Sequence, residues 1–267
     1  MRTLDHCPRE MLAGLRGLLT DFDGTLTTKG RLEAETYAAL SELKEAGLFL
    51  AVVTGRPAGW GELIARTFPV DACIAESGGV TFVKGRKGAV HRMYYTDDEA
   101  RRRRDRRKLE KLVAEVCAEV PGAKLSVDSG YTEVALSIDW NEDVKLSQED
   151  AIRIAEACRA RGARAVRSSL HVNVWLGDFD KATAADRLLV EVAKAKLPRD
   201  RSRFAFIGDA PNDEPLFDAF SASFGVADVK KVRGELEALP SWVTHSKGGE
   251  GFQELAAAIL VAKELIA

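Results

Sequence analysis

Cysteine is scarce in this sequence, and the few residues present lie far apart. The four cysteines, Cys7, Cys73, Cys117 and Cys158, form no CxxC pair and no Cys/His ligand spacing. This distribution argues against a disulfide-stapled scaffold or a zinc-binding module and is typical of reduced, mostly buried thiols. We therefore expect a cytoplasmic protein.

Long apolar runs and an excess of one charge are also missing. No stretch approaches the 18 consecutive apolar residues of a membrane span, and polar residues such as Asp5 and Arg9 stand where a signal peptide would be apolar. The net charge of −2 favours neither nucleic acid nor a membrane as a partner. The basic run Arg101–Lys108 could contact phosphates, but such runs are more often a solvated helix face. We expect a monomer or homodimer that binds a small molecule.

The sequence of 267 residues alternates between segments typical of buried strands and segments typical of helices. An apolar run at 15–22 precedes a helical pattern at 33–46, which ends at Gly47, and a second apolar run at 48–53 follows. This spacing predicts a βαβ unit with parallel strands. Similar segments recur at 59–67, 72–75, 180–196, 203–209, 223–226 and from 251 onward.

The middle of the chain has a different pattern. Hairpin-like strands at 80–83 and 89–93 flank a Gly-containing loop, and a long helix at 97–120 follows. Further segments predict strands at 127–128, 133–138, 163–166 and 170–176 and a helix at 147–161. We predict an α/β fold: a Rossmann-like, doubly wound parallel-sheet core at 1–81 and 179–267, with an inserted α+β cap domain at 82–178.

The chemistry is organised around the end of the first buried strand. Asp21 and Asp23 are separated by one residue and followed by Gly24. If the backbone is still extended there, the two carboxylates point the same way and repel each other, unless a cation lies between them or one carboxyl is protonated. The alternative is a strand that simply runs into a common Asp-Gly turn.

Other polar groups follow strands, or begin helices, at the same predicted edge of the sheet. Thr54 and Gly55 end the second strand, Lys181 starts a helix, and Asp209 ends a later strand four residues before Asp213. Ligands bind at this edge of open α/β sheets. Taken alone, Thr54 could be an ordinary turn residue and Lys181 a solvated lysine. The presence of all these residues at one edge of the sheet argues that they form a single ligand-binding site.

Together these stretches resemble the four motifs of the haloacid-dehalogenase-like superfamily of phosphohydrolases. The matching stretches are Asp21-Phe22-Asp23-Gly24-Thr25-Leu26, Thr54 in Val52-Val53-Thr54-Gly55-Arg56, Lys181, and Gly208-Asp209-Ala210-Pro211-Asn212-Asp213. The insertion between the second and third motifs resembles a type IIB cap, as in Cof-like, sucrose-phosphate and mannosyl-3-phosphoglycerate phosphatases. Ala182 after the lysine and Ser77-Gly78-Gly79 depart from common family patterns.

The resemblance implies a role for each motif residue. Asp21 would be the nucleophile that forms an aspartyl-phosphate, and Asp23 would be the general acid and base. Asp21, Asp23 through its backbone carbonyl, and Asp209 would bind Mg²⁺, with Asp213 orienting Lys181 or a metal-bound water. The phosphoryl oxygens would be held by Thr54, Gly55, Lys181 and Asn212.

Cap residues should select the substrate by closing over its leaving group. His171, Asn173 and Trp175 alternate along one predicted strand and share a face, which would suit a sugar; alternatively Trp175 packs in the cap core. Arg167, Ser168 and Ser169 precede them and could bind polar groups of the substrate.

The favoured function is thus a Mg²⁺-dependent phosphatase acting on a sugar phosphate or a related small phosphomonoester. A phosphomutase of the same fold is an alternative, because the aspartyl-phosphate could be returned to a second hydroxyl. A non-catalytic sensor of a phosphorylated metabolite is another, although binding alone does not require Asp23.

Overall fold

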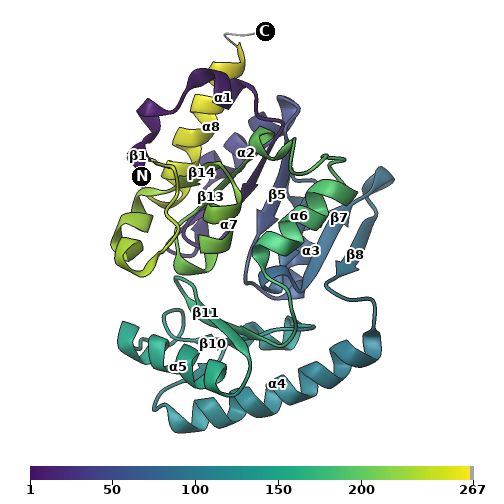
Figure 1. Cartoon of the computed structure of the whole chain (residues 1–267), viewed down its shortest axis with the longest axis vertical. Helices are drawn as coiled ribbons and strands as arrows, with labels where there is room; N and C mark the ends of the chain where they lie inside the picture. Colours follow the sequence, from purple (N-terminus) through teal and green to yellow (C-terminus); the bar gives the residue numbers. More distant parts are fainter. Residues whose placement is uncertain (265–267) are drawn as a thin grey trace.

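The computed structural model describes residues 1–264 and is built on a nine-stranded sheet (Figure 1). Seven strands are parallel, and a hairpin extends one edge in antiparallel fashion. In spatial order the strands are β1 (Arg2–Thr3), β15 (Trp242–Val243), β14 (Ala222–Gly225), β13 (Phe204–Gly208), β2 (Gly17–Thr20), β5 (Phe49–Val53), β6 (Ala72–Ala75), β7 (Val80–Lys84) and β8 (Val90–Tyr94). The first strand of the doubly wound pattern, β2, lies between β13 and β5. That strand order makes its carboxyl end a topological switch point.

Helices cover both faces of this sheet. One face packs against α1 (Arg9–Ala13), α2 (Ala34–Glu45), α3 (Ala58–Thr67) and α8 (Gly248–Glu264), and the other against α6 (Lys181–Glu191) and α7 (Glu214–Ala219). Neighbouring residues of β2 enter different cores, with Leu18 on the first face and Leu19 on the second. Burial on both faces explains why these strands are continuously apolar.

A second, four-stranded antiparallel sheet lies over the carboxyl ends of the parallel strands (Figure 1). Its order is β11 (Arg164–Arg167), β12 (His171–Trp175), β10 (Leu136–Asp139) and β9 (Lys124–Leu125). The helices α4 (Glu99–Glu119) and α5 (Gln148–Ala160) pack on one face through an apolar cluster that includes Val172 and Val174. The alternate residues of β12, His171, Asn173 and Trp175, point to the other face of this small sheet, toward the parallel-sheet core domain. The predicted fold class is confirmed: an α/β, doubly wound core with an α+β insertion.

Three local predictions were wrong. The β7–β8 hairpin pairs with β6 in the large sheet, because an antiparallel hairpin can extend the edge of either sheet and its sequence does not specify which. We therefore propose that the insertion begins after Tyr94 rather than at residue 82. Residues 127–128 lie in a 3-10 turn, η4 (Val127–Tyr131), in which Val127 is exposed and pairs with no strand within residues 1–264. Helix α6 ends at Glu191, before the left-handed backbone at Lys194.

The basic run forms the first turns of α4 on the insertion. Acidic neighbours one turn away pair with several of its arginines, as in the pairs Arg101–Asp105, Arg103–Glu99 and Arg106–Glu110. This arrangement agrees with the solvated-face interpretation rather than with a phosphate-binding surface.

Candidate active site

Three of the predicted carboxylates meet where β2 and β13 end. Asp21 directly follows β2 and Asp209 directly follows β13, and these strands are parallel neighbours. Asp213 closes the 3-10 turn η6 (Pro211–Asp213). Each of the three offers a carboxylate oxygen within 4.8 Å of the others, and all three residues are buried. Such proximity of like charges away from water requires positive charge nearby.

Part of that charge comes from Lys181, the first residue of α6. Its side chain is 2% exposed, and its Nζ donates to Asp21 Oδ1 and Asp213 Oδ1, at 2.7 Å each. The helix start is fixed by a capping box between Asp180 and Thr183. Against burial, the charges of Asp21 and Asp213 raise the pKa of Lys181, so the ammonium form is favoured.

Three carboxylates against one ammonium leave an excess of negative charge that a divalent cation would neutralise. Burial, followed by the charge of Asp213, raises the pKa of Asp21 to about 8. Burial, together with the charge of Asp21, raises the pKa of Asp209 well above its usual range. These shifts express the cost of ionising the cluster without a cation, and the oxygen donors fit a hard metal such as Mg²⁺.

The turn after β2 is shaped to approach Asp209 closely. Gly24 has a φ of +84°, and a Cβ at this position would lie 2.5 Å from Asp209 Oδ2. The neighbouring Thr25 hydroxyl donates to Asp209 Oδ1 at 3.2 Å. Glycine is therefore needed here for both its backbone conformation and its lack of a side chain.

Asp213 is held by the backbone of its own loop. Its Oδ2 accepts N–H bonds from Asp209 and Ala210, at 3.0 and 3.2 Å, while its Oδ1 binds Lys181. Because both carboxylate oxygens of Asp213 have partners within the protein, this geometry fits the predicted role of Asp213 in orienting Lys181 better than it fits direct binding of the metal.

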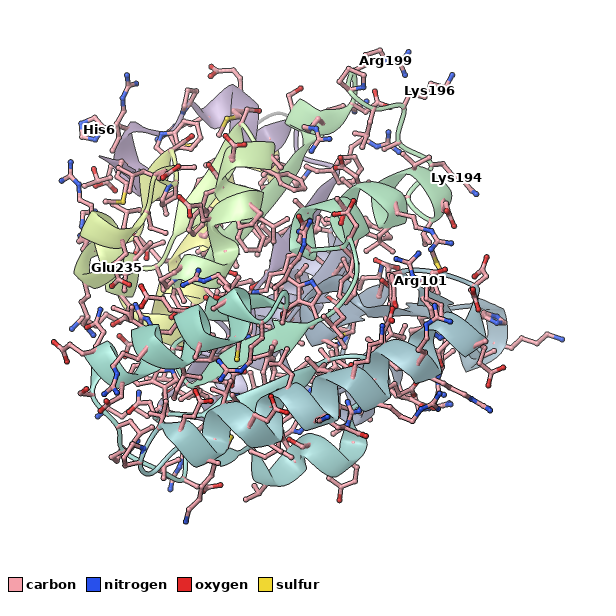
Figure 2. All side chains as sticks on the ribbon, turned by 60° about the horizontal axis from the view of Figure 1, so that its bottom comes forward. His6, Arg101, Lys194, Lys196, Arg199 and Glu235 are labelled. Carbon is pink, nitrogen blue, oxygen red and sulfur yellow. The ribbon has the colours of Figure 1, made fainter. Side chains whose placement is uncertain are left out.

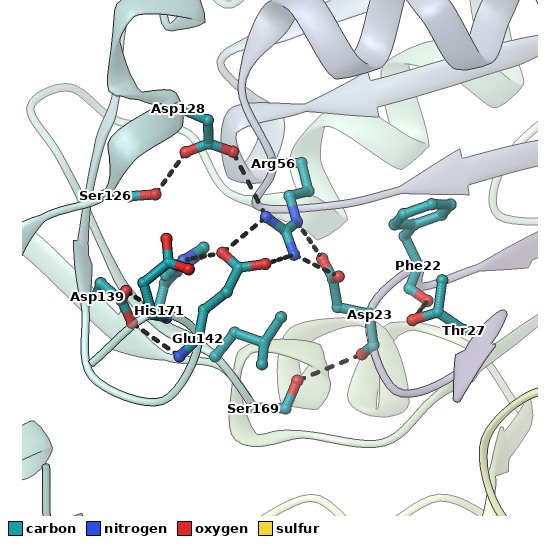
Figure 3. Close-up of polar contacts among 12 residues, drawn as sticks. Phe22, Asp23, Thr27, Arg56, Ser126, Asp128, Asp139, Glu142, Ser169 and His171 are labelled. Atoms are coloured by element: carbon teal, nitrogen blue, oxygen red, sulfur yellow. Dashed lines mark hydrogen bonds and ion pairs between the residues drawn. The ribbon is translucent and has the colours of Figure 1, made fainter. Parts of the chain in front are cut away.

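Asp23 lies outside the carboxylate cluster. The strand ends at Thr20, and Asp23 turns its carboxylate toward Arg56, with Arg56 Nε and one terminal nitrogen each 2.8 Å from a carboxylate oxygen (Figure 3). Its backbone carbonyl accepts a long bond of 3.4 Å from the Ser169 hydroxyl of the insertion. An extended backbone through both residues was the condition for the Asp21 and Asp23 side chains to face one cation, and it is not met, because β2 ends at Thr20.

The turn after β5 is contacted by the insertion. Thr54 is buried, and its hydroxyl oxygen accepts the N–H of Arg56 at 3.0 Å, so it does act within a turn while its own proton remains available. A Cβ on Gly55 would collide with the Asn173 amide of β12. The Ser137 hydroxyl donates to Asn173 Oδ1 at 2.9 Å, which directs the Asn173 Nδ2 donor toward this turn.

Asn212 lies in η6 beside Lys181 and is 8% exposed. Among the described residues its Oδ1 has no hydrogen-bond partner. Both residues line a cavity of about 350 Å³ between the core and the insertion. A buried, unpaired polar atom of this kind is expected where a ligand binds.

The remaining candidates of the insertion have mixed surroundings. Arg167 pairs with Glu235 and packs over the Trp140 ring, yet it lines a cavity of about 480 Å³ that also reaches Gly24 and Asp209. Ser168 is engaged in the tight turn between β11 and β12, where its hydroxyl donates to the His171 carbonyl at 3.1 Å. Neither contacts the carboxylate cluster directly.

Trp175 and His171 lie on the same face of β12 as Asn173, but the polar groups beside their side chains lie outside the turn after β5. The Trp175 indole donates to the Phe179 carbonyl at 2.9 Å and stacks on its ring, in agreement with the structural alternative. His171 Nε2 lies 2.9 Å from Glu142 Oε2 and does not contact the motif residues of the core.

Sequence reasoning missed three participants. Arg56 directly follows Thr54-Gly55, so its position beside a motif was a usable signal. Ser137 and Glu142 had none, because each gains its partner only through the packing of the insertion on the core.

This chain is similar to known proteins in its sequence and in its fold. Residues 18–104 match the family model described as haloacid dehalogenase-like hydrolase. A phosphoglycolate phosphatase from Haloarcula marismortui is 26% identical over 251 residues, covering 90% of this chain and 95% of that protein.

Two solved structures have a similar fold. One is Thermoplasma acidophilum 0175, with a TM-score of 0.68, 16% identity and coverage of 92% and 99% of the two chains. The other is the sucrose-phosphatase from Synechocystis in complex with sucrose and phosphate, with a TM-score of 0.64, 16% identity and coverage of 92% and 98%. Separately, none of the helices in residues 1–264 has the length and apolar character needed to span a bilayer.

Proposed function

We propose that this chain is a phosphatase of the haloacid dehalogenase-like hydrolases. It would hydrolyse a sugar phosphate or related small phosphomonoester with Mg²⁺, through an aspartyl-phosphate on Asp21. The observation that carries the proposal is the arrangement of Lys181, which binds Asp21 and Asp213 at 2.7 Å beside Asp209. A nucleophilic carboxylate, a fixed cation and an acidic metal site in contact are what phosphoryl transfer requires.

The reaction follows from the position of each group. Asp21 Oδ1 is held by Lys181, so Oδ2 is free to attack phosphorus while the ester P–O bond breaks. Asp23 gives its proton to the departing alkoxide. A water then attacks the aspartyl-phosphate, Asp23 takes the water's proton, and release of phosphate regenerates the Asp21 carboxylate.

The surrounding groups hold the phosphoryl oxygens. Lys181 supplies a point charge, and the Thr54 hydroxyl, the Gly55 backbone N–H and the side-chain NH₂ group of Asn212 would donate hydrogen bonds. Asp21, Asp209 and the Asp23 carbonyl would hold Mg²⁺, which when bound neutralises charge on the phosphoryl group.

The leaving group is proposed to contact the insertion. Asn173 and Ser169 reach the core next to Gly55 and Asp23, and they offer uncharged hydrogen-bonding groups that suit sugar hydroxyls. Arg167 and the cavity of about 480 Å³ beside Asp209 leave room for a larger or acidic leaving group. The phosphoglycolate phosphatase similarity makes a phosphorylated hydroxy acid the natural competitor in any substrate panel.

The test is phosphate release from a panel of sugar phosphates, phosphoglycolate and phosphoglycerates, with and without Mg²⁺. Asp21→Asn should abolish release, whereas the matched variant Asp218→Asn, which alters an exposed carboxylate of α7, should behave as wild type. Isomerisation of a sugar phosphate without net phosphate release would identify a mutase instead. Tight binding without turnover in the presence of Mg²⁺ would identify a sensor.

A further inference from the structure

The guanidinium of Arg56 lies between the core and the insertion and is fully engaged (Figure 3). Its Nε and one terminal nitrogen bind Asp23 at 2.8 Å each, its two terminal nitrogens bind Glu142 at 3.0 and 2.7 Å, and a further contact reaches Asp128 at 3.4 Å. These five contacts match the five N–H groups of a guanidinium. The Arg56 side chain is 4% exposed, and its Cζ lies 4.8 Å from the Trp60 ring centroid.

Glu142 is itself held in place by the insertion. Asp139, the last residue of β10, accepts the N–H groups of Glu142, Asp143 and Val144 at 2.8, 2.8 and 3.2 Å. The sheet register places His171 of β12 opposite Asp139, and its Nε2 lies 2.9 Å from Glu142 Oε2. The backbone of Glu142 is thus held by its loop, and the ring of His171, which lies opposite Asp139 in the register, lies against its carboxylate.

A series of ion pairs therefore connects Asp23 to Arg56 and Arg56 to Glu142, and only Glu142 belongs to the insertion. The remaining two are on the core, so the full bidentate arrangement exists only when the insertion is docked. Without Glu142 and Asp128, a buried guanidinium would lose three of its five contacts and would be free to rotate with Asp23.

We propose that Glu142 is a positioning residue, which acts through Arg56 to orient the Asp23 carboxyl group toward the leaving-group oxygen once the insertion closes. The inference rests on the proposed role of Asp23 as general acid. It makes closure of the insertion a requirement for proton donation, and not only a means of excluding water.

Two substrates separate this role from a merely structural one. p-Nitrophenyl phosphate has a good leaving group that departs without a proton, whereas the alkoxide of a sugar phosphate needs one. Because kcat/KM reports the steps up to leaving-group departure, a misplaced general acid should lower it for the sugar phosphate and affect the aryl ester little.

The experiment measures kcat/KM on p-nitrophenyl phosphate and on the sugar phosphate that wild type prefers, for Glu142→Gln, Glu142→Asp and Arg56→Ala. We expect Glu142→Gln to lose about 10- to 100-fold on the sugar phosphate and less than about threefold on the aryl ester, and Glu142→Asp to recover part of the loss. The double variant Arg56→Ala/Glu142→Gln should be no worse than Arg56→Ala, since Glu142 acts through Arg56. Glu149→Gln, an exposed glutamate of α5, is the matched control.

Equal losses on both esters, no loss on either, or additive losses in the double variant would each overturn the inference while leaving the phosphatase function intact. Activity on the aryl ester also shows that a variant has folded. A wild-type protein that releases phosphate from neither ester would instead overturn the proposed function, and this inference with it.

Discussion

Glu76 offers the sharpest test of how the insertion is attached to the core. This residue follows β6, is 1% exposed, and has a left-handed φ of +50°. Its Oε1 accepts the N–H groups of Ala58 and Glu133 at 2.9 and 2.7 Å, and its Oε2 accepts those of Val134 and Ala135 at 2.7 and 2.6 Å. One buried carboxylate thus satisfies the start of α3 on the core and three successive backbone groups of the insertion.

Replacing Glu76 with glutamine keeps the size of the side chain and removes one of its two acceptors. The new amide nitrogen would face two backbone N–H groups, either the pair bound by Oε1 or the pair bound by Oε2, and those donors would be left buried without partners. Each unsatisfied buried donor costs about 1–3 kcal/mol, so the variant should lose about 2–6 kcal/mol of unfolding free energy. For a protein of this size, that corresponds to a fall in Tm of roughly 4–24 °C.

Urea unfolding and thermal scans of Glu76→Gln, wild type and Glu45→Gln would measure the effect. Glu45 is the matched control, because it ends α2 in an exposed position. Loss of at least about 2 kcal/mol in Glu76→Gln, with Glu45→Gln within about 0.5 kcal/mol of wild type, is the expected result. A Glu76→Gln variant as stable as wild type would refute the argument that all four backbone N–H groups need the Glu76 carboxylate as their acceptor.

Three further predictions concern the site. Gly55→Ala should lower kcat/KM by at least about tenfold with a smaller effect on Tm, because the new Cβ displaces Asn173; kinetics and a thermal scan on the same preparation check this. Mg²⁺ at 100 times its Kd should stabilise the wild type by about 2.7 kcal/mol in a thermal-shift assay, and Asp209→Asn should lose most of that gain. The His171 ring and the Arg56 guanidinium, acting against burial, lower the pKa of Glu142 from 4.5 to about 2. Its contribution to stability is therefore present above about pH 4.5 and is lost as the pH falls toward 2, so the Tm gap between wild type and Glu142→Gln should narrow from pH 7 to pH 3.

The core of the site could be predicted because its signals are local. Asp21 and Asp209 each come directly after a short apolar run, and Lys181 stands at a helix start behind a capping residue. The rule that parallel strands end at one edge then brings such residues together, whatever the rest of the chain does. The same rule could not assign the β7–β8 hairpin, since antiparallel pairing at an edge is compatible with either sheet.

The contacts between core and insertion could not be predicted, for a physical reason. Arg56 and Glu142 are 86 residues apart, and Gly55 follows a strand of the large sheet while Asn173 belongs to the small one, so no periodicity or spacing relates them. Whether this arginine pairs with this glutamate is decided by how the insertion docks on the core. That docking depends on the shape of both surfaces, which a single sequence does not express.

The division between predictable and unpredictable residues follows the chemistry. In the proposed function Asp21, Lys181 and Asp209 act on the phosphoryl group, which every phosphomonoester shares, and they lie at strand and helix ends of the core. Asn173 and Glu142 lie on the opposite layer, next to Gly55 and Arg56, on the side where esters differ. A fold built this way can change its substrate by altering the insertion while the attacking carboxylate stays fixed. Substitutions of Asp21, Lys181 or Asp209 should accordingly reduce turnover of all esters alike, whereas substitutions of Asn173 should change the ranking among them.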